Sequence, residues 1–149
     1  MDTLAQATDG YTGADLREVI LTALKIAFHA GDRGWLDGVA LPYAAWLNGF
    51  TGLAITKLDV LDGLPELKIC TGYLVDGQEV KRVPDTVDMG RAEPVYEVWS
   101  GWQESTRDAR RWSELPRTAR TYLDRISELA ATPLQYISVG PGRDQLIVL

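Results

Sequence analysis

The sequence predicts an α/β domain in which a mixed sheet is flanked by helices. Two stretches, residues 16–27 and 113–131, place apolar side chains at helical spacing. Short apolar segments lie between and after them, bounded by glycine and proline, as is typical of strands. Two of these segments are joined by Asp76-Gly77, a dipeptide that strongly indicates a β-hairpin.

The composition is that of an ordinary soluble domain. The chain has 149 residues, 46% hydrophobic and 24% charged, enough for one moderate core. No apolar run approaches the roughly 20 residues of a membrane span, and the net charge of −6 argues against a nucleic-acid surface. Cys70 is the sole cysteine, so no internal disulfide can form, and its apolar neighbours predict a buried thiol. We expect a cytoplasmic protein with no membrane or nucleic-acid partner.

The amino-terminal residues 1–31 have a pattern of their own and precede a domain at 32–149. Thr12 is placed to cap a helix, with Asp15 three residues on as a near capping box. The apolar stripe that follows predicts an amphipathic helix that ends near Gly31. We expect this helix to pack on the following domain.

Part of this segment has a further interpretation. The run at 7–16, with its Gly13-Ala14 dipeptide, resembles the lid subdomain of AAA-type ATPases, where that dipeptide lies near the adenine nucleotide. The 149 residues contain no glycine-rich phosphate loop ending in Gly-Lys-Ser/Thr, so a packing helix is favoured over an ATP contact. His29, the only histidine, is interpreted as a helix-end residue and not as a catalyst.

The stretch 51–64 contains the best candidate for a site. Leu53-Ala54-Ile55 is apolar enough for a buried strand, and Lys57 and Asp59 follow it directly. Charges are costly in an apolar strand unless they emerge at its end or meet a partner. Ligands in open α/β sheets bind at the carboxyl ends of strands, whereas the simpler alternative is a strand-end salt bridge.

The chemistry of the two charged side chains favours a purine. The Asp59 carboxylate can accept two parallel hydrogen bonds from guanine, one from N1–H and one from the 2-amino group. Adenine has an acceptor at N1 and no 2-amino group, so a site built on this pair would reject it. The stem of Lys57 can lie along the purine face while its ammonium stays hydrated.

Several further elements follow from pattern. We expect strands at 67–75, 78–83, 95–99, 136–138 and 145–149, a loop at 84–92, and a helix over 113–131 with Pro116 in its first turn. The helix turns an apolar stripe inward, formed by Ala119, Tyr122, Ile126 and Leu129.

Two groups of side chains near this helix have a structural interpretation. The tryptophans at 99, 102 and 112 are expected to pack a loop onto the sheet, in preference to forming a stacking platform. A set of arginines is expected to form a solvated face paired with acidic neighbours. This set is Arg110, Arg111, Arg117, Arg120 and Arg125.

From Gly34 to Leu149 the chain resembles the carboxyl-terminal part of adenylosuccinate synthetase, the GTP-dependent ligase of purine synthesis. Its motifs occur in the family's order and at similar spacing. They are Gly34-Trp35-Leu36-Asp37, Leu47 through Leu53, Thr56 through Gly63, Leu67-Lys68-Ile69-Cys70, Pro94-Val95-Tyr96-Glu97, Gly101 through Thr106, Ser138 through Arg143, and Ile147 with Leu149.

This resemblance implies a fragment of the P-loop-NTPase-like fold of that family and a guanine-binding site made of two segments. The first is Lys57-Leu58-Asp59, and the second is Ser138-Val139-Gly140, where the family has Ser-Thr-Gly. Val139 lacks the threonine hydroxyl but keeps the backbone, whose N–H groups can meet the purine carbonyl. The sheet is expected to bring the two segments together into one base pocket.

The resemblance also implies what this chain lacks. The family carries its phosphate loop, catalytic aspartate and histidine, and magnesium ligands in the amino-terminal part, which has no counterpart here. A Gly-Arg-rich loop of the family is replaced by residues 28–32, and Arg33 is out of register. We therefore expect a truncated, synthetase-like protein that has no catalytic residues and no Mg²⁺ site, binds GTP or GDP weakly, and is inactive as a ligase by itself.

Other interpretations stay open at this stage. Apolar faces that the missing part would cover favour a homo-oligomer or a complementing chain as partner. The main alternative is a non-catalytic structural or interaction domain with a vestigial nucleotide pocket. An engineered or recombined chimera, joined near Gly31, is the other alternative.

Overall fold

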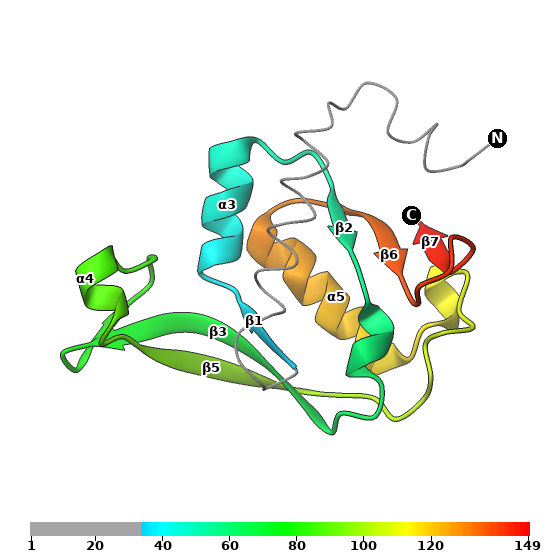
Figure 1. Cartoon of the computed structure of the whole chain (residues 1–149), viewed down its shortest axis with the longest axis horizontal. Coiled ribbons are helices and arrows are strands. Elements are labelled where there is room, and N and C mark those ends of the chain that lie inside the picture. Colours follow the sequence, from blue (N-terminus) through cyan, green and yellow to red (C-terminus); the bar gives the residue numbers. More distant parts are fainter. Residues whose placement is uncertain (1–33) are drawn as a thin grey trace.

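The computed structural model describes residues 34–149 (Figure 1). The predicted amino-terminal helix, the lid-like run and His29 lie outside the described residues. The elements run in the order β1 (Trp35–Asp37), α3 (Ala40–Asn48), β2 (Leu53–Ile55), the 3-10 helix η1 (Leu58–Leu61), β3 (Glu66–Val75), β4 (Gln78–Val80), α4 (Thr86–Met89), β5 (Glu93–Ser100), the 3-10 helix η2 (Trp112–Glu114), α5 (Arg117–Ala130), β6 (Leu134–Ser138) and β7 (Leu146–Val148).

The strands form two mixed sheets, which confirms the predicted α/β class. In the larger sheet, β3 pairs in parallel with β1 and antiparallel with β4 and β5. Tyr73 of β3 pairs with Val80 on one edge and with Pro94 on the other, so β4 and β5 lie on opposite sides of β3. In the smaller sheet, β2 is parallel to β6, and β7 is antiparallel to β6.

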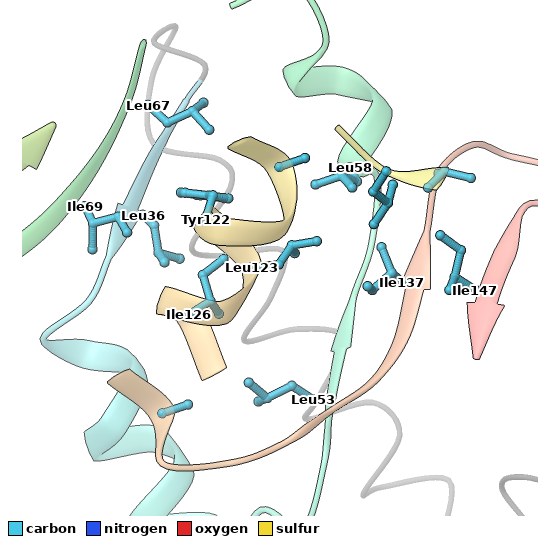
Figure 2. Close-up of a cluster of buried hydrophobic side chains, with 14 of the residues drawn as sticks. Leu36, Leu53, Leu58, Leu67, Ile69, Tyr122, Leu123, Ile126, Ile137 and Ile147 are labelled. Carbon is cyan, nitrogen blue, oxygen red and sulfur yellow. The ribbon is translucent and has the colours of Figure 1, made fainter. Parts of the chain in front are cut away.

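Helix α5 lies between the two sheets and carries the centre of the core (Figure 2). Its predicted inward stripe is confirmed, since Ala119, Tyr122 and Ile126 are buried and Leu129 is half-buried. Leu123, also fully buried, completes this face. Figure 2 shows side chains from both sheets directed at the helix. These are Leu36, Leu67 and Ile69 from the larger sheet and Leu53, Ile137 and Ile147 from the smaller one.

The ends of α5 follow from proline and from backbone geometry. The helix begins after Pro116, which is its N-cap, and the predicted residues before it form the separate turn η2. At the other end, Ala131 takes a left-handed conformation (φ 49°), and its N–H donates to the carbonyl oxygens of Ser127 and Glu128. Pro133 then prevents the helix from continuing.

The β3–β4 hairpin forms at Asp76-Gly77 as predicted. Both residues have positive φ, 50° and 79°, which is the geometry that two-residue hairpin turns need. The prediction of a loop at 84–92 was wrong in one place, because this stretch contains the short helix α4. Asp85 caps it by accepting hydrogen bonds from the N–H groups of Val87 (3.0 Å) and Asp88 (2.8 Å).

Strand β1 and helix α3 were not assigned from the sequence. Asp37 fixes their junction, because its Oδ1 accepts from the N–H groups of Val39 (3.0 Å) and Ala40 (2.9 Å) while its Oδ2 accepts from the Tyr73 hydroxyl. Burial and this contact with Asp37 raise the pKa of Tyr73 far above its ordinary value. Cys70 is buried beside Tyr73, as predicted, and burial raises the pKa of its thiol.

Some apolar side chains face solvent in the described part of the chain. On α3, Tyr43 and Trp46 are exposed and their rings lie 6.3 Å apart, centroid to centroid. Val98 is exposed as well. It belongs to β5, which has β3 as its paired neighbour. Across residues 34–149, no helix combines the length and the apolar character needed to cross a membrane.

Candidate functional site

The candidate site forms where β2 and β6 end. These strands run in parallel, with Ile55 opposite Ile137, so the residues that follow each strand lie at the same edge of the smaller sheet. The segment after β2 contains Lys57-Leu58-Asp59, and the segment from the end of β6 is Ser138-Val139-Gly140. The structure therefore places the two segments at one edge of the smaller sheet, and their use as a single base pocket stays a prediction. Figure 1 shows β2 and β6 side by side with η1 beyond the end of β2.

The first segment turns sharply after β2. Lys57 takes a left-handed conformation (φ 59°, ψ 41°) as the N-cap of η1. The next side chain, Leu58, is 1% exposed and packs in the main core. This burial anchors η1 to the sheet, and it leaves Leu58 able to meet a ligand through its backbone only.

Asp59 is the least exposed charged side chain of the two segments. Its side chain is 7% exposed, and its Oδ2 lies 3.2 Å from Nε of Arg107, a residue of the loop between β5 and α5. Arg107 is itself 64% exposed. The strand-end salt bridge considered as an alternative is thus present, and its partner is a residue that the sequence analysis had not singled out.

Asp62 also holds the loop between β5 and α5. Its Oδ1 accepts from Trp102 Nε1 (2.8 Å) and Thr106 Oγ1 (2.9 Å), and its Oδ2 accepts from the Thr106 N–H (2.8 Å). Trp102 and Thr106 are both buried, and the Trp102 ring packs against Tyr122 of α5. Trp102 therefore anchors its loop in the core, as predicted, and does not form a stacking platform.

The second segment is a compact turn. Ser138 Oγ donates to the Gly140 carbonyl (2.9 Å), and the N–H of Val139 donates to the Gln145 carbonyl (3.0 Å). Val139 is fully buried. A Cβ at position 140 would overlap the end of the Gln145 side chain, so a larger residue there would require that side chain to move. Because the Val139 N–H is engaged within the turn, Gly140 supplies the N–H that we expect to meet a ligand.

Gln145 connects the turn to the loop that carries Arg107. Its Oε1 accepts from the Gly142 N–H (2.9 Å), and its Nε2 donates to the Arg107 carbonyl (3.3 Å). An ion pair between Arg110 and Asp144 (3.2 Å) joins the same two segments. Arg107 therefore contacts both halves of the site, Asp59 through its guanidinium and Gln145 through its carbonyl. No local sequence signal reveals these contacts, because the partners lie far apart in the chain.

The predicted arginine face is confirmed in part. Arg111 pairs with Glu114 (2.6 Å), and Arg125 pairs with Glu97 of β5 (2.9 Å). The hydrogen bond from Arg125 holds the pKa of Glu97 below its ordinary value. Arg120 differs, since its Nε is buried and has no hydrogen-bond partner among the described residues.

The polar groups of the two segments are a carboxylate, an ammonium group, a hydroxyl and backbone N–H groups. Asp59 is a nearly buried carboxylate, Lys57 is the N-cap of η1 two residues before it, and Gly140 lies in the turn that follows β6. Within residues 34–149, no three side chains of the His, Cys, Asp or Glu type gather as a metal ion would require.

Comparison with known proteins identifies the family. Residues 29–147 match the family model of adenylosuccinate synthetase. The chain is 47% identical over 150 residues to "Adenylosuccinate synthetase 1, chloroplastic" of Ricinus communis, which covers 100% of this chain and 33% of that protein. It is 52% identical over 117 residues to adenylosuccinate synthetase of Methylobacillus flagellatus, covering 78% of this chain and 27% of the other.

A solved structure gives the same result at the level of the fold. The fully ligated adenylosuccinate synthetase from Plasmodium falciparum superposes with a TM-score of 0.73 at 31% identity, over 93% of this chain and 35% of that one. The resemblance of residues 7–16 to an ATPase lid finds no support in these comparisons, and the relative from Ricinus communis aligns along the whole chain. The chain spans about a third of the length of the curated relatives that it matches, and it belongs to the adenylosuccinate synthetase family.

Proposed function

We propose that this chain provides the guanine-recognition part of a GTP-dependent ligase, the enzyme that joins IMP and aspartate to form adenylosuccinate. The residues assigned to the base are Lys57, Leu58 and Asp59 from one segment, and Ser138, Val139 and Gly140 from the other. Membership of the family supports this proposal, as do the nearly buried Asp59 carboxylate and the pairing of the strands that precede the two segments.

The observation that carries the proposal is the parallel pairing of β2 with β6. Ile55 and Ile137 are register partners, so Asp59 and Gly140 follow strands that end together. Asp59 would accept from guanine N1–H and the 2-amino group, and the Gly140 N–H would donate to the carbonyl at position 6. Lys57 would lie along the purine face. Leu58 and Val139 have buried side chains, so their contribution would come from the backbone.

The remaining steps of the ligase reaction need groups that these 149 residues do not supply. Phosphoryl transfer depends on charges positioned around the phosphates, and the sequence has no phosphate loop. We therefore propose weak binding of GTP or GDP and no ligase activity by this chain alone. A complementing chain would provide the phosphate site, whereas a homo-oligomer would cover exposed apolar faces without adding a phosphate loop, and we expect a cytoplasmic location.

Calorimetric titration of the full chain tests the proposal. GDP should bind saturably, ADP should not, and inosine diphosphate, which lacks the 2-amino group, should bind more weakly than GDP. Asp59→Asn should abolish GDP binding, because its amide nitrogen presents donors to the donor edge of guanine. The matched variant Asp144→Asn removes one charge from the exposed ion pair with Arg110 and should keep GDP binding. Absence of heat with GDP up to millimolar concentration would reject the proposal.

A second candidate function is a structural or interaction domain whose nucleotide site is vestigial. The ion pair between Asp59 and Arg107 favours this candidate, because the carboxylate already has a partner in the free protein. It predicts no binding of GDP, and it predicts that Asp59→Asn affects the stability of the fold only.

A further inference from the structure

The Asp59 carboxylate would contact a base in the proposed function, but in the free protein it already contacts an arginine. Its role in the proposed function requires both carboxylate oxygens to face a base. In the free protein, Oδ2 lies 3.2 Å from Arg107 Nε and the side chain is 7% exposed. A base can therefore reach both oxygens only after a neighbouring group moves aside.

Arg107 is the neighbour that can move. Its side chain is 64% exposed, so solvent is available to receive the guanidinium when it leaves Asp59. The preceding residue, Thr106, is fixed on Asp62 through its N–H and its hydroxyl.

The Arg107 carbonyl is held as well, by Arg110 Nη1 (2.8 Å) and by Gln145 Nε2 (3.3 Å). With the backbone held at these points, the movement is confined to one side chain.

We infer that Arg107 is a gate on the base site: its guanidinium occupies Asp59 in the free protein, and guanine binds by displacing it. This inference rests on the proposed function and deepens it. The gate also adds discrimination between bases. When the ion pair breaks, guanine donates two hydrogen bonds to the Asp59 carboxylate and so compensates for its loss. A base that donates one hydrogen bond or none does not compensate for it.

The size of the effect follows from the exposure of the pair. Ion pairs with an exposed partner contribute little, and their loss changes an equilibrium by about two- to fivefold. Removal of the guanidinium by Arg107→Gln should therefore tighten binding of the base by this factor. An arginine that instead oriented Asp59 for the base would give the opposite sign.

Guanosine is the probe that isolates this effect. It carries no phosphate, so attraction between Arg107 and a phosphate cannot enter the measurement. Binding to the full chain is followed by NMR chemical-shift titration of wild type, Arg107→Gln and Arg111→Gln. The last variant is the matched control, since it removes the same charge from the same loop, where Arg111 pairs with Glu114 and not with Asp59.

Salt provides a second, independent measurement. Added salt weakens exposed ion pairs, so the affinity of wild type for uncharged guanosine should rise between low and high salt. The affinity of Arg107→Gln should stay constant, and Arg111→Gln should behave as wild type does.

The outcomes separate the gate from the function on which it rests. Equal or weaker binding by Arg107→Gln would overturn the gate while leaving guanine recognition intact. Failure of guanosine to bind any of the three proteins would overturn the proposed function and the gate together. Tighter binding by Arg107→Gln alone, with loss of the salt dependence, is the result that we expect.

Discussion

The candidate site and the β3–β4 hairpin lie toward opposite ends of the molecule (Figure 1), and they are held by contacts of different range. At the hairpin end, the turn is set by Asp76-Gly77 and α4 by its neighbour Asp85. At the site end, Asp62 binds Trp102 and Thr106 from another part of the chain, and Arg107 reaches Asp59. One end is specified by short stretches of sequence, whereas the other exists only when the whole domain is folded.

The largest expected difference in unfolding free energy is between a substitution in the core on α5 and one on α4 at the hairpin end. Leu123→Ala removes a fully buried side chain of α5 and should lower the free energy of unfolding by about 2 to 5 kcal/mol in urea denaturation. Val87→Ala, at an exposed position of α4, should change it by less than about 0.5 kcal/mol. Similar losses for the two variants would show that the hairpin end is as tightly packed as the core.

The second-largest loss of stability is expected when the buried hydrogen bonds of Asp62 are removed. Asp62→Ala leaves the buried Trp102 Nε1 and both donors of Thr106 without their acceptor, at a cost of about 2 to 3 kcal/mol. The comparison variant at the other end is Arg91→Ala, which breaks exposed ion pairs with Asp76 and Asp88 and should cost less than Asp62→Ala. Chemical denaturation of both variants tests this order, and a larger loss in Arg91→Ala would reverse it.

A smaller and local effect is expected at α4. Asp85→Ala removes the acceptor for the N–H groups of Val87 and Asp88, which should destabilise this helix and leave the rest of the fold unchanged. Hydrogen exchange at those two amides should accelerate. Exchange at the buried strand β6 should stay the same, and acceleration there would mean that the hairpin end and the site end unfold as one unit.

The smallest effect concerns the ion pair that connects β5 to α5. Arg125 depresses the pKa of Glu97 in the folded state, so the pair stabilises the protein above the unfolded-state pKa of about 4.5. This contribution should disappear as the pH falls through the lower, folded-state pKa of Glu97. Glu97→Gln should therefore remove less than about 1 kcal/mol at pH 7 and nothing at the acid end. A constant difference between the two proteins across this range would contradict the assignment.

The elements predicted from the sequence are those with local signals. The hairpin at Asp76-Gly77 and the buried stripe of α5 were predicted because turn chemistry and helical spacing are properties of neighbouring residues. The strand ending at Ile55 was predicted for the same reason, and with it the position of Lys57 and Asp59.

The features that were missed depend on contacts across the chain. Strand β1 has three residues, too few to show alternation, and it is defined by its pairing with β3. Arg107 and Gln145 look like ordinary surface residues until the fold brings them against Asp59 and the Gly140 turn. The sequence predicted the two segments that follow β2 and β6, and their role in binding a base stays a prediction; it had no information on the residues that connect these segments.

The parallel pairing of β2 with β6 also has a consequence for the time at which the site can appear during synthesis. Ile55 and Ile137 are separated by about 80 residues, so closing this contact requires nearly the whole domain to have left the ribosome. A nascent chain that ends before Ser138 carries Asp59 without the glycine turn that follows the paired strand β6. The proposed affinity for a guanine base would then be a late property of the growing chain, and its appearance would report that the smaller sheet has formed.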